Sequence, residues 1–207
     1  MSGLRERKRR RTRETIASAA LRLFRESGFD GVSVADIAAA AEISKPTLFA
    51  YFPTKEDLVI HQFMDDNGPA EIVRTRPAGM SALSALEESF LNRLAERDPL
   101  TGLNDSADAI TCHTLLYSTP ALLARLATYL LQKEQDLVDE LQASCGVRDE
   151  FTARLAASQV FGAQRILGFH NAWEIRGGRS ADETYPDAVA RAKAAYRMLR
   201  EGLSSVL

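Results

Sequence analysis

Residues 44–51 read Ser-Lys-Pro-Thr-Leu-Phe-Ala-Tyr, and several of these side chains have the chemistry of nucleic-acid recognition. Lys45 and Thr47 can donate hydrogen bonds to base edges or to phosphates in a DNA groove. The hydroxyl of Tyr51 can bind a phosphate oxygen, and Phe49 or Pro46 can contact a thymine methyl group. We therefore predict that this segment contacts DNA.

The residues around this segment predict two short helices that would present it. Ser33 is a preferred N-cap residue, and Asp36 three positions later completes a capping-box pattern for a helix that ends near Ala41. Ser44 is a second N-cap, and Pro46 follows in the first turn, where a missing N–H costs nothing. Two such helices joined by a tight turn predict a helix-turn-helix, whose second helix enters a DNA major groove. The hydroxyls of both cap serines can also bind phosphates.

Over roughly residues 12–60 the chain resembles the TetR family of transcriptional regulators, on the motif Ile37-Ala38 and then Ile43-Ser44-Lys45-Pro46-Thr47-Leu48-Phe49-Ala50-Tyr51-Phe52-Pro53-Thr54-Lys55-Glu56-Asp57-Leu58. The resemblance implies DNA contacts at the outward positions of the second helix, which are Lys45, Pro46, Thr47, Phe49, Ala50 and Tyr51. It also implies a phosphate contact at Lys55, beside a helix start where N–H groups attract anions. Family members commonly have glycine in the turn, where this chain has Glu42. If that position is left-handed, glutamate costs about 1 kcal/mol relative to glycine.

Basic residues are concentrated in the first thirteen positions of the chain. These positions carry six arginines and one lysine against a single glutamate, a net charge of +6, whereas the rest of the chain carries −8. A basic segment beside a helix-turn-helix is suited to a polyanion. We predict that residues 1–11 form a flexible arm that contacts DNA, with Arg11 among the contacts. The alternative is a solvated tail that only aids solubility.

Composition predicts a folded protein that is not inserted in a membrane. The 207 residues are 45% hydrophobic and 26% charged, and no uncharged apolar run approaches the ~20 residues of a membrane helix. The charged N-terminus is followed by no apolar stretch of the secretory kind. Cys112 and Cys145 are too few for a disulfide framework, so we expect reduced thiols and a cytoplasmic location.

The sequence contains no motif of a known catalytic or metal site. Besides His61 and His170, the only histidine is His113, and on a helix it would diverge by ~100° from the adjacent Cys112. There is no HExxH, CxxC, glycine-rich phosphate loop or G-x-S-x-G. We therefore expect no enzyme, no catalytic residues, no metal and no cofactor. Two alternatives without DNA binding are a helical-bundle enzyme with a Cys or Glu nucleophile and an α-helical protein interaction module.

Apolar residues recur at helical spacing along the rest of the chain, and strand-like alternation persists nowhere. We predict an all-α fold of about nine helices. A helix-turn-helix DNA-binding domain would span residues 12–56, and a helical ligand-binding and dimerisation domain would span residues 57–207. The fourth helix should run to about Asp66 and link the two.

The last two predicted helices carry surplus apolar surface. Paired with their copies they would form a four-helix interface, which agrees with the dimers of the family. The residues expected in this interface are Phe151, Leu155, Gly162, Ile166, Val189, Tyr196 and Leu199. The alternative is that both helices only cover their own core.

The family resemblance also implies a small-molecule site between the middle helices. The scarcity of charges in these helices points to an apolar or amphipathic ligand. Candidate contacts that combine an apolar body with a polar tip, or fill space between them, are His61, Met64, Phe90, His113, Tyr117, Phe161, Gln164 and Trp173. The implied mechanism is a homodimer that binds a palindromic double-stranded operator and is released by the ligand, and repression is the family's usual mode.

Overall fold

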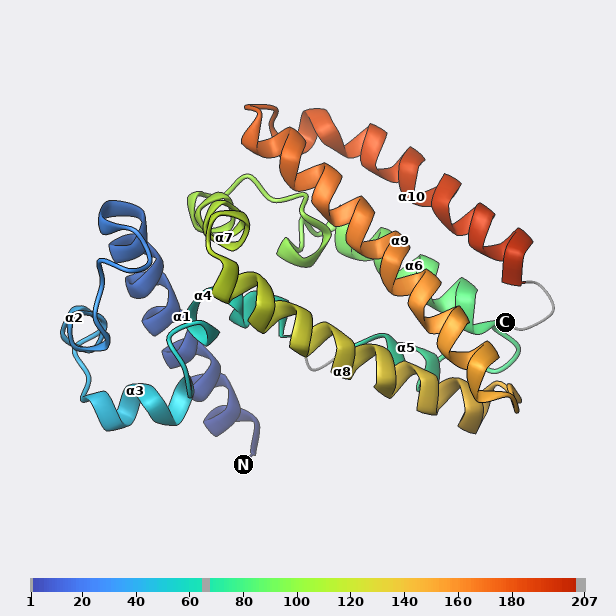
Figure 1. Cartoon of the computed structure of the whole chain (residues 1–207), viewed down its shortest axis with the longest axis horizontal. Coiled ribbons are helices and arrows are strands. Elements are labelled where there is room, and N and C mark those ends of the chain that lie inside the picture. Colours follow the sequence, from blue (N-terminus) through green and yellow to red (C-terminus); the bar gives the residue numbers. More distant parts are fainter. Residues whose placement is uncertain (1, 65–67, 204–207) are drawn as a thin grey trace. The chain divides into compact units, whose positions relative to one another are not determined.

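A computed structural model of the chain describes residues 2–64 and 68–203 (Figure 1). The α-helices in these ranges are α1 (Ser2–Ser27), α2 (Val34–Ala40), α3 (Lys45–Tyr51), α4 (Asp57–Ile60), α5 (Pro69–Arg74), α6 (Ala82–Ala95), α7 (Ala107–Ser118), α8 (Pro120–Ser144), α9 (Glu150–Arg176) and α10 (Ala181–Leu203). Two 3-10 helices, η1 (His61–Phe63) and η2 (Pro99–Thr101), complete the set. The described ranges contain no β-strand, which confirms the predicted all-α class.

The chain divides into two compact units, and the division does not follow the order of the sequence. The head unit comprises residues 1–64 and 106–126, and the body unit comprises residues 65–105 and 127–207. Helix α7 packs against α1 and α4, although more than forty residues separate α4 from α7 along the chain, and the first turns of α8 belong to the same unit.

The core of the head unit is built from one face of α1 and the inner sides of α2 and α3. Ile16, Ala20 and Phe24 are almost fully buried on α1, at the helical spacing that the sequence predicted. Leu48 and Phe52 on and after α3 have no exposed surface. The helix-turn-helix thus has a fixed inner side, and its outer side is left to solvent.

The first helix differs from the prediction at its N-terminal end. We expected it to begin at Thr12 after a flexible arm, but α1 begins at Ser2 and includes that arm. Arginine, lysine, glutamate and leucine are good helix formers, and no proline interrupts residues 2–27. The predicted end was right, because Gly28 has φ 73° and its N–H binds the carbonyl of Phe24.

The segment after α3 also differs from the prediction of one long fourth helix. Helix α4 ends at Ile60, and η1 continues it only to Phe63. The predicted end at Asp66 lies outside the described residues. A separate helix, α5, then begins at Pro69, with Gly68 as N-cap and the proline in the first turn, where its missing N–H is tolerated.

The body unit is centred on the pair α9 and α10, which run side by side, with α6 packed against α10 (Figure 1). Tyr196 on α10 has no exposed surface, and its hydroxyl donates to the carbonyl of Leu86 on α6. Gln164 on α9 donates to the same hydroxyl at 2.8 Å. These bonds satisfy the polar atoms that join the three helices, as burial requires.

None of the described helices combines the length and the apolarity needed to cross a membrane.

Candidate nucleic-acid interface

Helix α2 is held at its start by the capping box that the sequence predicted. The N–H of Ser33 donates to Asp36 Oδ2 at 2.9 Å, and the N–H of Asp36 donates to Ser33 Oγ at 3.2 Å. The bonds from Ser33 lower the pKa of the Asp36 carboxyl below its ordinary value, so it is ionised at neutral pH. The negative charge lies in the first turn of α2, where the helix dipole favours it.

The turn between α2 and α3 contains one strained residue. Glu42 has φ 55°, the left-handed conformation in which glutamate is less favourable than the glycine that the family commonly has there. Ser44 then caps α3 by accepting the N–H of Thr47, with Pro46 in the first turn. The local sequence therefore accounts for the position and direction of α3.

Helix α3 has a buried side and an exposed side, as expected for a reader helix. Leu48 is fully buried, while Lys45, Pro46, Thr47, Phe49 and Ala50 are exposed. Tyr51 is half-buried at the end of the helix. The residues predicted to face DNA thus lie together on the outer side of α3, and their contacts with DNA remain a prediction.

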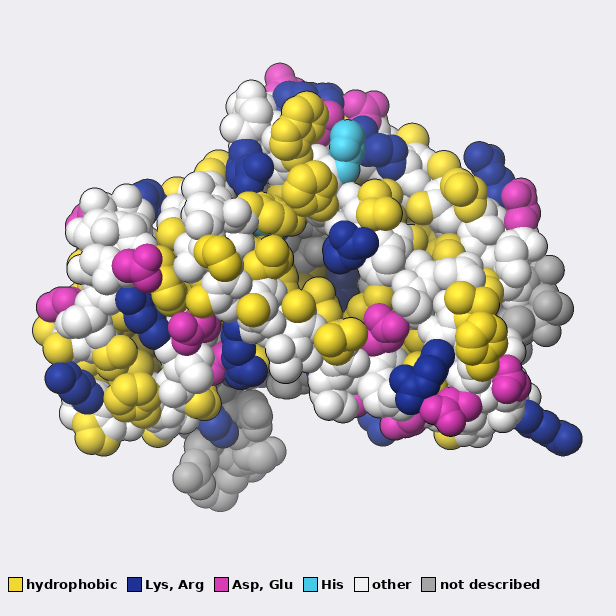
Figure 2. Space-filling model, viewed as in Figure 1, with side chains coloured by type: hydrophobic (Ala, Val, Ile, Leu, Met, Phe, Trp, Pro, Cys, Tyr) yellow, Lys and Arg dark blue, Asp and Glu magenta, His cyan; other side chains and the backbone are white. Residues whose placement is uncertain are grey.

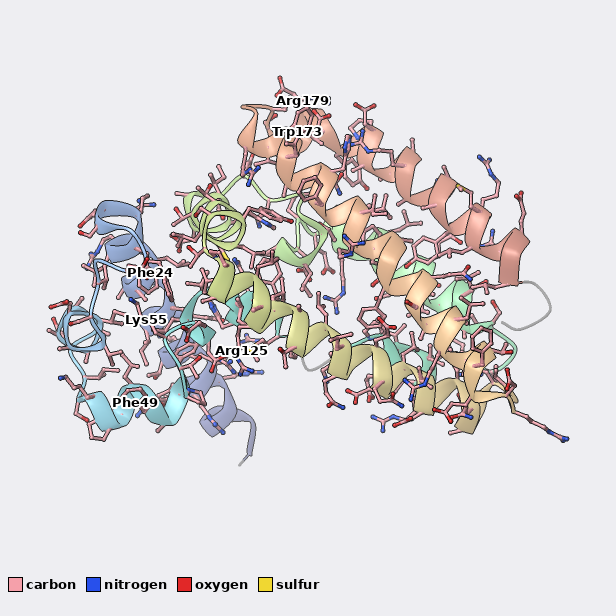
Figure 3. All side chains as sticks on the ribbon, in the orientation of Figure 1. Phe24, Phe49, Lys55, Arg125, Trp173 and Arg179 are labelled. Carbon is pink, nitrogen blue, oxygen red and sulfur yellow. The ribbon has the colours of Figure 1, made fainter. Side chains whose placement is uncertain are left out.

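Lys55 occupies a different environment from the one that the sequence suggested. Its Nζ donates to the carbonyl of Phe29 and lies 4.3 Å from the centre of that ring. It also lies 5.7 Å from the centre of the Phe24 ring. Figure 3 labels Lys55 and Phe24 in the head unit. In this structure the ammonium group ties the start of α4 to the end of α1, and a phosphate contact at Lys55 remains a prediction.

Thr54 and Asp57 form a second capping box, directly after α3. Thr54 N–H donates to Asp57 Oδ2 at 3.1 Å, and Asp57 N–H donates to Thr54 Oγ1 at 3.2 Å. The other carboxylate oxygen accepts Arg125 Nε at 2.9 Å. Arg125, labelled in Figure 3, lies in the first turns of α8, so this ion pair joins α8 to the chain that leaves the reader helix.

The end of α3 is enclosed by charged and polar groups from two other elements. The guanidinium of Arg13 lies 5.1 Å from the centre of the Phe52 ring, and the ring of His61 meets Phe52 edge-on at 5.7 Å. Burial lowers the pKa of His61 below its ordinary value, and the charge of Arg13 acts in the same direction. His61 is therefore neutral at pH 7, and its Nδ1 lies 3.0 Å from the carbonyl oxygen of Leu58.

The basic run at residues 7–11 is an exposed part of α1, so helical geometry decides which side each residue takes. With 3.6 residues per turn, Arg9 and Arg10 lie within about 60° of Arg13, whose guanidinium covers the end of α3. Arg11 lies about 160° away from Arg13 around the helix. The helix therefore makes Arg9 and Arg10 better candidates than Arg11 for contacts beside α3. A flexible arm would not have distinguished these arginines.

The residues expected to bind a ligand fall in both units. His61, Met64, His113 and Tyr117 belong to the head unit, and there His113 packs edge-on against Phe63. Phe90, Phe161, Gln164 and Trp173 belong to the body unit, where Phe90 and Gln164 both contact Tyr196. Trp173 is 56% exposed, and the structure therefore places it on the surface of α9 rather than in an interior pocket.

The residues expected at a dimer interface also divide into two groups. Phe151, Leu155 and Ile166 are exposed along one side of α9, at helical spacing. Tyr196 and Leu199 are buried inside the body unit, so their assignment to a surface was wrong. The apolar stripe on α10, which had suggested this assignment, faces α6 and α9. Sequence analysis missed Phe169, which is 45% exposed and continues the α9 stripe toward Trp173.

Two observations bear on catalysis and metal binding. Across residues 2–64 and 68–203, no group of three or more His, Cys, Asp or Glu side chains is placed to hold a metal ion. Burial raises the pKa of the Cys112 thiol to about 12, and its Sγ donates to the carbonyl of Val59. A thiol that stays protonated and enclosed is a poor nucleophile, which weighs against a Cys112 enzyme.

Comparison with known proteins agrees with this geometry. A family model described as "Bacterial regulatory proteins, tetR family" matches residues 16–61. The HTH-type transcriptional regulator TcmR of Streptomyces glaucescens is 31% identical over 180 residues, which cover 84% of this chain and 78% of TcmR. The HTH-type transcriptional regulator RutR of Escherichia coli O157:H7 is 32% identical over 136 residues, covering 63% of this chain and 58% of RutR. The chain belongs to the tetR family of bacterial regulatory proteins.

The fold also resembles that of a solved structure. Salmonella enterica GusR superposes with a TM-score of 0.53 at 22% identity, over 92% of this chain and 94% of GusR. At this identity the likeness concerns the fold alone. Together with the helix-turn-helix and the relatives, it establishes the chain as a DNA-binding transcriptional regulator.

Proposed function

We propose that the chain is a homodimeric repressor that binds a palindromic DNA operator through α3 and leaves it when a small molecule binds. The observation that carries the proposal is the geometry of α3. Its inner side is fixed by the fully buried Leu48 and Phe52, its start is capped by Ser44, and its outer side is exposed. A short helix held in this way can enter a major groove without rearranging.

The exposed side of α9 supports the homodimer. Phe151 is 73% exposed and Ile166 is 60% exposed, and with Leu155, Phe169 and Trp173 they form a stripe along the helix. An apolar stripe of this length is typical of an interface rather than of a free surface. Pairing with a second copy would cover it and would place two reader helices on one duplex.

The interior of the body unit supports release by a small molecule. The body unit has a largely apolar interior, in which Phe90 and Gln164 both contact the buried Tyr196. That chemistry suits an apolar or amphipathic ligand. By linkage, the ligand and the operator must weaken each other's binding by the same factor. The role requires no catalysis and no cofactor.

The first experiment is selection of bound duplexes from a random DNA pool, followed by affinity measurements on the winner at several salt concentrations. We expect a palindromic sequence and a steep salt dependence, because each phosphate contact adds about 0.9 to the slope of log K against log salt. Weak binding to every duplex, with no sequence enriched, would overturn the proposal.

The dimer is tested separately by changing its proposed interface. Ile166→Lys places a charge in the middle of the α9 stripe and should convert the dimer to a monomer in sedimentation at micromolar concentration. Leu131→Lys is the matched control, since Leu131 is 67% exposed and lies on α8 rather than on α9. An unchanged mass for Ile166→Lys would exclude this surface as the interface.

A further inference from the structure

The outer side of α3 has fewer available polar groups than its sequence suggests. The hydroxyls of Ser44 and Thr47 lie 2.7 Å apart and bind each other, and the N–H of Thr47 donates to Ser44 Oγ. Both hydroxyls therefore serve the start of the helix. Lys45 at the beginning of α3 and Tyr51 at its end remain as polar side chains that can reach outward.

Apart from Thr47, whose hydroxyl is bonded to that of Ser44, the outer side of α3 between Lys45 and Tyr51 is apolar. Pro46, Phe49 and Ala50 are all exposed, and their spacing of three and four residues puts them on one side of the helix. Phe49 is 46% exposed, whereas its neighbour Leu48 is fully buried on the opposite side. Figure 2 shows apolar side chains gathered over α3, with a basic side chain beside them, and Figure 3 labels Phe49 on this helix.

The major groove offers one apolar group that such a surface can recognise. Guanine, adenine and cytosine present hydrogen-bond donors and acceptors there, and thymine adds its C5-methyl group. An exposed ring without a polar atom cannot hydrogen-bond to the donors and acceptors of the bases. When it packs against the thymine methyl group, however, apolar area on both is removed from water, which is favourable.

We propose that Phe49, flanked by Pro46 and Ala50, is a specificity-determining residue that reads thymine methyl groups in each half-site of the operator. The inference rests on the proposed function, because it assumes that α3 enters the major groove. It adds the basis of sequence choice: apolar contact in the middle of the helix, with polar contacts from Lys45 and Tyr51 on either side.

The test uses the full-length protein and the duplex selected from the random pool. Each thymine is replaced in turn by deoxyuridine, which lacks only the methyl group, and the affinity is measured at one fixed salt concentration. We expect one or two thymines in each half-site at which the affinity falls about fourfold, the effect of one buried methyl group. Uracil outside the half-sites should change nothing.

Variants of the protein show whether Phe49 makes the contact. Phe49→Ala should bind the thymine duplex more weakly and should lose the difference between thymine and uracil at the sensitive positions. Lys45→Ala should weaken both duplexes and keep that difference. Leu131→Ala, which shortens an exposed apolar side chain on α8, should bind as the unaltered protein does. Because Phe49 is exposed, its truncation should leave the circular dichroism spectrum unchanged.

The outcomes separate the two proposals. If a duplex is selected and binds equally well with uracil at every position, the thymine inference is wrong and the proposed function stands. The inference is also wrong if Phe49→Ala keeps the full preference for thymine over uracil. If no duplex is selected at all, the proposed function itself fails and this inference fails with it.

Discussion

The head unit contains the same capping motif twice, before α2 and before α4, and the two copies have different surroundings. In both, a hydroxyl accepts an N–H three residues later while an aspartate accepts the N–H of the cap residue, with distances between 2.9 and 3.2 Å. Asp36 of the first box is exposed to solvent. The side chain of Asp57 in the second box is only 4% exposed, and Arg125 binds its remaining oxygen.

This difference shows how a residue that is distant in the sequence changes the contribution of a local motif to stability. The first box satisfies two backbone groups at a helix end, and its remaining side-chain bond, from Ser33 Oγ to Asp36 Oδ2, stays within the box. The second does the same, and it also fixes the beginning of α8 against the segment that follows the reader helix. We therefore expect the second box to contribute more to the stability of the head unit and to the placement of α3.

The largest effect should follow from Arg125→Ala. This change leaves the carboxylate of Asp57 buried without its cation, and we expect a loss of about 2–3 kcal/mol in the free energy of unfolding. That is less than the ~3–5 kcal/mol of fully buried pairs, because the Arg125 side chain is 37% exposed. Denaturant unfolding followed by circular dichroism, at one protein concentration, measures it.

A second substitution distinguishes a buried charge from lost packing. Asp57→Asn removes the charge and keeps an oxygen for the N–H of Thr54, so Arg125→Ala with Asp57→Asn should be more stable than Arg125→Ala alone. A double variant that is less stable than the single one would contradict the ion-pair explanation. So would an Arg125→Ala protein within about 0.5 kcal/mol of the unaltered chain, which is the usual range of surface changes.

Asp36→Ala tests the exposed box and should have a smaller effect. It removes the acceptor of one N–H in a place that water reaches, and we expect a smaller loss than that of Arg125→Ala in the same unfolding measurement. The comparison between the two boxes would be broken if Asp36→Ala cost as much as Arg125→Ala.

The same pair of boxes shows what the sequence can predict. The spacing of Ser33 to Asp36 and of Thr54 to Asp57 indicates both boxes, because their bonds join residues three apart. The family's glycine at the position of Glu42 also pointed to the left-handed backbone that the structure shows there. Local chemistry thus defines the helix-turn-helix and most of the residues on its outer side.

The partners of these local elements could not be predicted, because they come from distant parts of the chain. Nothing near Arg125 indicates that it binds Asp57, and nothing near Lys55 indicates that its ammonium reaches the carbonyl of Phe29. Tyr196 has the spacing of a surface stripe, yet its hydroxyl binds the carbonyl of Leu86 inside the body unit. The start of α1 was misjudged for another reason: charge was read as disorder although the residues favour a helix.

Glu42→Gly should offset the loss of the exposed box. Glycine adopts φ 55° without strain, and we expect a gain of about 0.5–1 kcal/mol in the free energy of unfolding. If the two effects are independent, the double variant with Asp36→Ala should return close to the stability of the unaltered protein. A loss on Glu42→Gly alone would mean that the glutamate side chain makes a stabilising contact.

The smallest effect concerns pH, and it follows from the ionisation of Asp36. The hydrogen bond from the Ser33 side chain and then that from the Ser33 backbone lower the pKa of this carboxyl below 3.8, its ordinary value. The folded protein therefore binds fewer protons than the unfolded chain between these two pKa values. The stabilisation is fully present above about pH 3.8 and is lost as the pH falls through the folded pKa.

The measurable quantity is the difference in unfolding free energy between the unaltered protein and Asp36→Ala. This difference should be constant from neutral pH down to about pH 4 and should shrink below that, because protonation ends the charged hydrogen bonds that alanine also lacks. A difference that stays constant down to pH 2.5 would show that the box acts through its shape alone. Because the carboxylate is exposed, added salt should screen its interaction with the dipole of α2 as well. The buried pair of Asp57 and Arg125 should be less sensitive to salt, which gives the comparison of the two boxes a second measurement that needs no further variants.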